Sequence, residues 1–272
     1  MNKIYKVKKN AAGHLVACSE FAKGHTKKAV LGSLLIVGIL GMATTASAQV
    51  KVTNSKGTGA HIGVNNNNEA PGNYSFIGGG DYNEAKGTHS TIGGGDSNTA
   101  TGKHSTIGGG FFNEAKNEYS TIGGGDNNEA KGKYSTIGGG LFNEATNEYS
   151  TIGGGDSNSA TGSYSTIAGG RDNQATKENS TVGGGGLNQA TGRNSTVAGG
   201  YKNKATGVDS TIAGGRNNQA NGIGSFAAGV DNQANANNAV ALGNKNIING
   251  NNSAAIGSNN TIGSDKQDVF IL

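Results

Sequence analysis

The chain has 272 residues, of which 33% are apolar and 6% aromatic, with 50 glycines and no tryptophan; this composition excludes a single densely packed globular core. The net charge of +4 belongs to the N-terminal segment, because residues 1–48 hold seven Lys and one acid, Glu20, and the remainder carries 15 basic and 17 acidic residues. That remainder has no basic stripe, which excludes a nucleic-acid partner.

The first predicted element is a secretory signal over residues 1–48. An apolar run, 29–42, follows a Lys-rich segment, and Ala46-Ser47-Ala48 supplies the small residues of a cleavage site between Ala48 and Gln49. The run is short for a bilayer span, which favours a cleaved signal over an uncleaved anchor. The one cysteine, Cys18, lies inside this segment, so no disulfide is expected after cleavage.

The basic part of the leader is unusually long. It contains Met1-Asn2-Lys3-Ile4-Tyr5 and, further on, Ser19-Glu20-Phe21-Ala22-Lys23-Gly24. It resembles the extended signal peptide of large Gram-negative autotransporters and related secreted adhesins, although Lys8-Lys9 stands where that pattern usually has an apolar and aromatic pair. The resemblance implies export to the outer surface of a Gram-negative cell. Residues 49–59 are expected to form a lead-in.

A repeat of fifteen residues built on Ser-Thr-Ile-Gly-Gly-Gly dominates residues 60–258. Its opening serine recurs without a slip at Ser75, Ser90, Ser105, Ser120, Ser135, Ser150, Ser165, Ser180, Ser195, Ser210 and Ser225. Two more units open at Ala239 and Ser253, with a period of fourteen residues. Fixed self-similarity indicates a repeat architecture, so the glycine triplets are interpreted as structural and not as phosphate loops or calcium repeats.

Each unit contains two short runs typical of strands, each followed by turn formers. An Asn recurs from Asn83 to Asn218, and an Ala follows it two residues later, from Ala85 to Ala220. The pattern predicts an all-β fold, a parallel β-solenoid whose coils stack about 4.8 Å apart. Ile and Val side chains would then form one ladder, and the Asn amides would pair from coil to coil or cap backbone groups.

A turn with positive φ is predicted once per coil. Two residues after the recurrent Ala, nine of ten units have Gly or Asn, which tolerate this conformation. Lys177 is the exception, and its turn is expected to be strained or altered.

The repeats also predict an oligomer. Each coil offers one Ile or Val and one Ala as dependable apolar residues, which is little for fifteen ordered residues. In Ala239-Val240-Ala241-Leu242-Gly243 the large apolar residues are the second and the fourth, whereas in Ser-Thr-Ile-Gly-Gly the large apolar residue is the third. Neighbouring residues of a strand point to opposite faces, so this strand accepts apolar groups on both faces. One face would look into the coil and the other at a partner subunit.

The units Ala239–Gly243 and Ser253–Gly257 resemble the head repeats of YadA-like trimeric autotransporter adhesins. With the leader and the STIGGG units, the chain is most similar to the ubiquitous surface protein A adhesins. The resemblance implies a left-handed parallel β-roll in a side-by-side homotrimer that binds host matrix proteins or cell-surface receptors. It also implies anchoring through a C-terminal barrel, which this chain lacks, so residues 259–272 are expected to lead towards a missing neck and stalk.

The two variable residues after each glycine triplet are the candidate ligand contacts, because they lie at a turn and are expected to be exposed. The candidates chosen among them are Tyr82, Phe111, Phe112, Leu141, Phe142 and Tyr201. Exposed paired aromatics often mark interaction surfaces, and subunit packing is the alternative role.

The sequence offers three further possibilities. His89 and His104 lie one period apart and could bind a metal, but they belong to a stripe of Tyr and His that favours ring stacking. A polysaccharide-cleaving solenoid enzyme would need an acidic or basic cluster on one face, and none is evident. An ice- or mineral-binding solenoid would use the Thr ladder from Thr91 to Thr211. We therefore expect a non-enzymatic adhesin head without cofactors.

Overall fold

The computed structural model describes residues 6–9, 15–18, 57–63 and 67–272, and it divides into two units, Met1–Lys51 and Val52–Leu272. In the first unit, β1 (Lys6–Lys9) pairs antiparallel with β2 (Leu15–Cys18). The predicted apolar run and the cleavage site between Ala48 and Gln49 lie outside the described residues. In the part that is described, no helix is long and apolar enough to cross a membrane.

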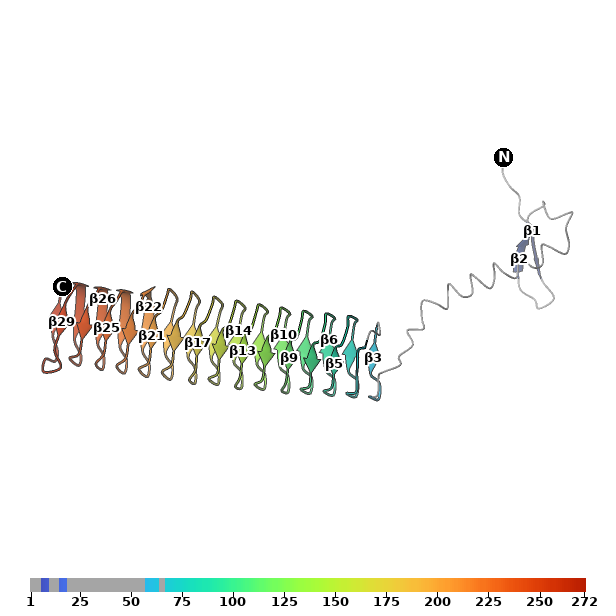
Figure 1. Ribbon diagram of the computed structural model, residues 1–272, viewed down its shortest axis with the longest axis horizontal. Helices are drawn as coiled ribbons and strands as arrows, with labels where there is room; N and C mark the ends of the chain where they lie inside the picture. The colour runs from blue at the N-terminus through green and yellow to red at the C-terminus, as the bar shows by residue number, and fades with distance from the viewer. Residues whose placement is uncertain (1–5, 10–14, 19–56, 64–66) are drawn as a thin grey trace, which may run out of the picture. The chain divides into compact units, whose positions relative to one another are not determined.

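The second unit is the predicted parallel β-solenoid, and its coils follow one another in single file (Figure 1). Most coils contribute one strand to each of two sheets. The first sheet consists, in spatial order, of β3 (His61–Ile62), β4 (Phe76–Ile77), β6 (Thr91–Ile92), β8 (Thr106–Ile107), β10 (Thr121–Ile122), β12 (Thr136–Ile137), β14 (Thr151–Ile152), β16 (Thr166–Ile167), β18 (Thr181–Val182), β20 (Thr196–Val197), β22 (Thr211–Arg216), β24 (Phe226–Val230), β26 (Val240–Asn244), β28 (Ala254–Ser258) and β30 (Phe270–Ile271). The second sheet consists of β5 (Glu84–Ala85), β7 (Thr99–Ala100), β9 (Glu114–Ala115), β11 (Glu129–Ala130), β13 (Glu144–Ala145), β15 (Ser159–Ala160), β17 (Gln174–Ala175), β19 (Gln189–Ala190), β21 (Lys204–Ala205), β23 (Gln219–Ala220), β25 (Gln233–Ala234), β27 (Ile247–Ile248) and β29 (Thr261–Ile262).

The register between coils is in step with the sequence repeat. Thr121 lies opposite Thr136, and Ile122 lies opposite Ile137. Successive residues of a strand point to opposite faces, so the Ile ladder fills the interior while the Thr ladder points outward. Ile137 and Ala145 are both fully buried, and Thr136 is only partly so. The interior of a typical coil therefore holds one large and one small apolar side chain, as predicted.

The predicted Asn ladder is confirmed, and it both pairs amides and caps backbone groups. Asn143 is almost completely buried, and its Nδ2 donates to the carbonyl oxygens of Gly139 (3.0 Å) and Gly155 (2.9 Å). Its Oδ1 accepts hydrogen bonds from the backbone N–H and the Nδ2 of Asn158, both at 3.0 Å. Each Asn thus satisfies polar groups of its own coil and of the coils on either side, which would otherwise be buried without a partner.

The predicted left-handed turn was placed at the wrong residue. Gly87, Asn117 and Lys177 all lack positive φ, whereas the residue before each Ser has it, as in Tyr134 (φ 59°). Glycine suits the Gly87 place for a different reason: a Cβ there would lie 2.0 Å from the carbonyl oxygen of Gly102 in the next coil. Lys177 adopts ordinary φ.

Side chains of the residues before each Ser form a stack of seven rings along the turn that joins the second sheet to the first, which we call the tyrosine edge. The rings belong to Tyr74, His89, His104, Tyr119, Tyr134, Tyr149 and Tyr164. His89 and His104 stack with centroids 4.9 Å apart and planes within 4°. The stacking prediction is confirmed, because the two imidazoles face each other through their ring planes.

Two outward-facing rows of the first sheet carry no charge; among the described residues the charged member of its strands is Arg216, at the end of β22. From Phe76 to Ile256, neither the outward residue before the inward-facing one nor the residue after it is charged. In the last coils this face becomes apolar, because Phe226 lies opposite Thr211 while the buried Ala227 lies opposite Ile212. Apolar groups thus occur on both faces of the same sheet, as predicted.

Candidate ligand-binding edge

The glycine edge is the turn that joins the first sheet to the second, from the glycine triplet to the residue before the ladder Asn. The third glycine of each triplet has positive φ and approaches the next coil closely. At Gly125 φ is 91°, and a Cβ would lie 2.1 Å from the carbonyl oxygen of Gly140. This close approach sets the two variable residues that follow at the outside of the coil. The second of them also has positive φ, as in Phe142 (51°).

All six candidate contact residues lie on this edge and are exposed. Each of these residues retains between 36% and 59% of its accessible surface: Tyr82, Phe111, Phe112, Leu141, Phe142 and Tyr201. The structure brings Phe111 and Phe112 into an edge-to-face contact with ring centroids 4.2 Å apart. That geometry is favourable for an aromatic pair, so the two rings form one preformed apolar knob.

The remaining candidates are spaced along the edge. Single parallel bridges join Phe111 to Asp126 and Asp126 to Leu141, so the two apolar pairs lie two coils apart with a polar coil between them. Four further bridges lead from Leu141 to Tyr201. The edge therefore presents separated apolar points along a regular line, and not one continuous patch.

The charge of this edge changes sign along the chain. Asp81, Asp96, Asp126 and Asp156 follow the triplets of the first coils, whereas Arg171 and Arg216 take the same ladder place later. The variable pairs were recognised in the sequence, but their change of sign was missed. It becomes visible when residues at one ladder place are read in coil order.

The outer face of the second sheet carries a ladder of ion pairs, which corrects the expectation that no charged cluster exists. Lys116 contacts Glu114 (2.8 Å) and Glu129 in the next coil, and Lys131 contacts Glu129 (2.7 Å) and Glu144 (2.5 Å). The ladder was missed because its members are nearly a full repeat apart in sequence.

Lysine contacts also set the ionisation of this ladder. Hydrogen bonds with Glu114 and Glu129 raise the pKa of Lys116. Partial burial raises the pKa of Glu129, but hydrogen bonds from Lys116 and Lys131 outweigh it and lower that pKa overall. A lowered carboxyl pKa is the reverse of what a general acid needs, so the ladder is interpreted as structural. The described residues contain no group of three or more His, Cys, Asp or Glu side chains suited to a metal ion.

A comparison with protein-family models finds one match, to the ubiquitous surface protein adhesin repeat, over residues 195–207. The matched stretch covers most of one fifteen-residue unit, and its Ser195, Asn203 and Ala205 are fully buried. The same three residue types recur in the neighbouring coils. The chain thus contains a repeat similar to those of surface adhesins. None of the curated proteins compared with the chain matches it.

Proposed function

We propose that this chain is the head of an exported surface adhesin that attaches a Gram-negative cell to host cells or matrix proteins without catalysing a reaction. The observation that carries the proposal is the adhesin repeat match on a rigid β-solenoid whose glycine edge exposes Phe111, Phe112, Leu141 and Phe142. The leader over residues 1–48 supports export.

The proposal includes a side-by-side homotrimer. Burial between sister chains needs a face without charge, and the outer face of the first sheet has none at its Thr and Gly rows. In the last coils Phe226, Val240 and Leu242 are only partly buried there and Ile256 is 47% exposed, which leaves apolar surface for a second and third copy. The charged second sheet and the glycine edge would then face outward.

Three copies make attachment multivalent. Each glycine edge repeats its contact points at intervals of two to four coils, and a trimer presents three such edges at a fixed spacing. Once one edge is bound, the others bind at a raised effective concentration, so weak contacts add up to firm attachment.

The test is binding of the purified full chain to immobilised matrix proteins and cultured epithelial cells. The variant replaces Phe111 and Leu141 by Asp and Phe112 and Phe142 by Asn, the Asp126-Asn127 pair of the coil between them, so the fold tolerates the new residues. We expect binding to fall at least about tenfold, as for aromatic hot spots.

The control variant changes the exposed aromatics of the opposite edge, Tyr149 and Tyr164, to Asn, which occupies that ladder at Asn179 and Asn194. It should bind like the unaltered chain. Failure of the unaltered chain to bind any matrix protein or cell would overturn the adhesin proposal, and equal binding by both variants would remove the glycine edge from the contact.

A further inference from the structure

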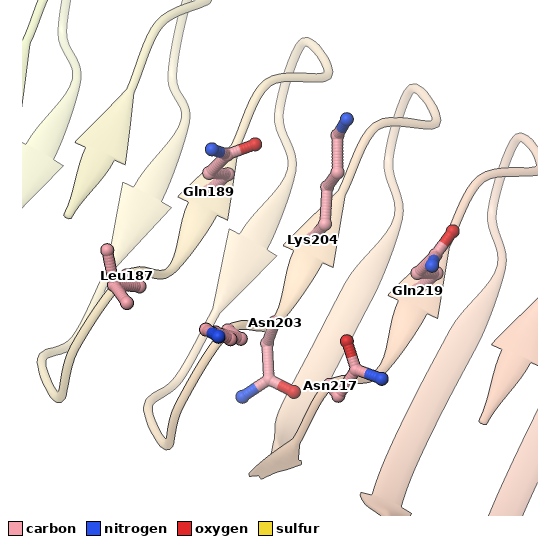
Figure 2. A pocket seen from close by; sticks show the side chains of 7 residues that line it. Leu187, Gln189, Asn203, Lys204, Asn217 and Gln219 are labelled. Atoms are coloured by element: carbon pink, nitrogen blue, oxygen red, sulfur yellow. The ribbon is translucent and has the colours of Figure 1, made fainter. Parts of the chain in front are cut away.

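A hollow of about 300 Å³ lies on the second sheet beside the glycine edge, near the C-terminal end of the fifteen-residue coils. Its lining comes from three successive coils: Leu187, Gln189, Lys202, Asn203, Lys204, Asn217 and Gln219. Figure 2 shows Gln189, Lys204 and Gln219 side by side on β19, β21 and β23, with Leu187, Asn203 and Asn217 at their base. We call this hollow the amide groove.

The amide groove has cations and amides but no carboxylate in its lining. Lys202 and Lys204 are exposed, and among the residues that the structure describes neither forms an ion pair. Lys202 Nζ lies 5.4 Å from the ring centroid of Tyr201, the residue before it on the glycine edge.

The acids on either side of the groove are already engaged. Asp172, one coil before Leu187, pairs with Arg171 at 3.5 Å. Asp231, one coil beyond Asn217, accepts a hydrogen bond from Asn217 Nδ2 at 2.8 Å. Of these two acids, Asp172 is paired with an arginine, and Asp231 forms no ion pair with Lys202 or Lys204 among the described residues.

The ladder place that lines the groove changes from acid to amide along the solenoid. Glu114, Glu129 and Glu144 occupy it in earlier coils, where lysines neutralise them. Gln189 and Gln219 occupy it here, on either side of Lys204. Exchange of Glu for Gln keeps the size of the side chain and removes the charge, so the groove gains a positive potential that the earlier coils lack.

We propose that the amide groove binds an acidic saccharide, one bearing a carboxylate or a sulfate. The ammonium groups of Lys202 and Lys204 would pair with the anionic substituent by charge-assisted hydrogen bonds. Gln189, Gln219 and Asn217 offer amide donors and acceptors to ring hydroxyls, and Leu187 offers apolar contact to the C–H face of a sugar. The hollow is at the small end of ligand sites and fits one or two sugar residues.

This inference rests on the proposed adhesin function, since acidic saccharides coat host cells, but it has a test of its own. The purified full chain is titrated with sialyllactose, a heparin-derived sulfated disaccharide, and lactose as the neutral analogue. We expect measurable binding of an acidic sugar that weakens as salt rises, and no binding of lactose. The carboxylated and the sulfated probe decide which anion is preferred.

Two variants use residues already present at the same ladder places. Lys202→Asn with Lys204→Gln copies Asn217 and Gln219, and Gln189→Glu with Gln219→Glu copies the earlier coils. Each should weaken binding of the acidic sugar at least about tenfold, because each removes or cancels both free cations. A charge-matched control, Lys103→Gln with Lys177→Gln, changes exposed lysines on the tyrosine edge and should leave binding unchanged.

The proposal is overturned if no acidic sugar binds, or if the control variant loses as much affinity as the groove variants, which would mean diffuse attraction by net charge. If the unaltered chain attaches to cells but binds no acidic sugar, this inference is wrong and the proposed adhesin function still stands. Loss of sugar binding in the groove variants alone would support it.

Discussion

The fifteen-residue coils before Ser225 and the fourteen-residue coils after it differ by one residue on the glycine edge. Where they meet, Ile212 lies opposite Ala227 and Gly214 lies opposite Ala228, which leaves Ala213 as the extra residue of a bulge. Except in the last of them, where β22 has six residues, the fifteen-residue coils break the first sheet into two-residue strands followed by a single bridge, whereas β24, β26 and β28 run on for five residues. The extra residue thus turns a continuous strand into a short strand and a corner.

The interiors of the two regions hold the same kinds of side chain on opposite sheets. In a fifteen-residue coil the first sheet supplies Ile137 and the second supplies Ala145, whereas in a fourteen-residue coil the first sheet supplies Ala241 and the second supplies Ile248. All four are fully buried. Either sheet can therefore supply the large interior residue, and the coil that begins at Ser225 has none, since its buried sheet residues are Ala227 and Ala234.

The largest expected effect concerns what the two regions share, the Asn ladder. Asn143→Ala and Asn232→Ala should each destabilise the solenoid by about 3 to 4 kcal/mol, because each leaves several buried backbone and amide groups without partners. Urea denaturation followed by circular dichroism measures the loss. The exposed Glu148→Ala is the control, and a small loss in either Asn variant would show that the ladder is not essential to the coils.

The next largest effect tests whether either sheet can supply the large interior residue. Ile137→Ala should cost about 3 kcal/mol by leaving a cavity in the interior. Adding Ala145→Ile copies the arrangement of Ala241 with Ile248, so the double variant should recover about half of that loss. The comparison between the regions fails if the second substitution destabilises the chain further.

Two glycines of the same triplet on the glycine edge should differ in how much stability is lost when each is changed to Ala. Gly125→Ala should cost about 2 kcal/mol, since its φ is 91° and the added Cβ would meet the Gly140 carbonyl. Gly124→Ala should cost less than about 1 kcal/mol, because its Cβ would make ordinary contact at 3.9 Å with Gly109. Gly243→Ala, with φ 113° in the fourteen-residue region, should behave like Gly125→Ala. Thermal melts of the three variants check the order.

The smallest effect is confined to the fifteen-residue coils, where the ion-pair ladder lies. The pKa of Glu129 is lowered on folding, which means that the folded state binds this proton less tightly than the unfolded state. The ion pairs therefore stabilise the fold fully at pH values above 4.5, the ordinary pKa of the carboxyl group. That contribution, about 0.5 kcal/mol for a partly exposed pair, is lost as the pH falls below 4.5 through the lowered pKa. Melting temperatures across this range should fall less in Glu129→Gln than in the unaltered chain.

Much of the fold could be predicted because the strongest constraints repeat. The Ile, Asn and Ala ladders follow from residues that recur at one spacing and from the alternation of side chains along a strand, as in Thr136-Ile137. The positive φ of Tyr134 and Phe142 could not be predicted from those residues, since neither type favours that conformation; the signal lies in Asn179 and Asn127, which hold the same two ladder places in other coils. The handedness of the coils stays a prediction.

The candidate site was predictable in part. Exposure of Phe111 and Leu141 on one edge follows from their place after the glycine triplet. The amide groove could not be predicted, because its residues Leu187, Lys204 and Gln219 come from three different coils and form a shared surface only when the coils stack.

A homotrimer requires sister chains to cover the uncharged outer rows of the first sheet. Light scattering of the purified full chain measures this directly. We predict a mass of three times 27.1 kDa for an uncleaved chain, falling to that of one chain when Leu242 and Ile256 are changed to Ser. A stable, folded single copy of the unaltered chain would contradict the account.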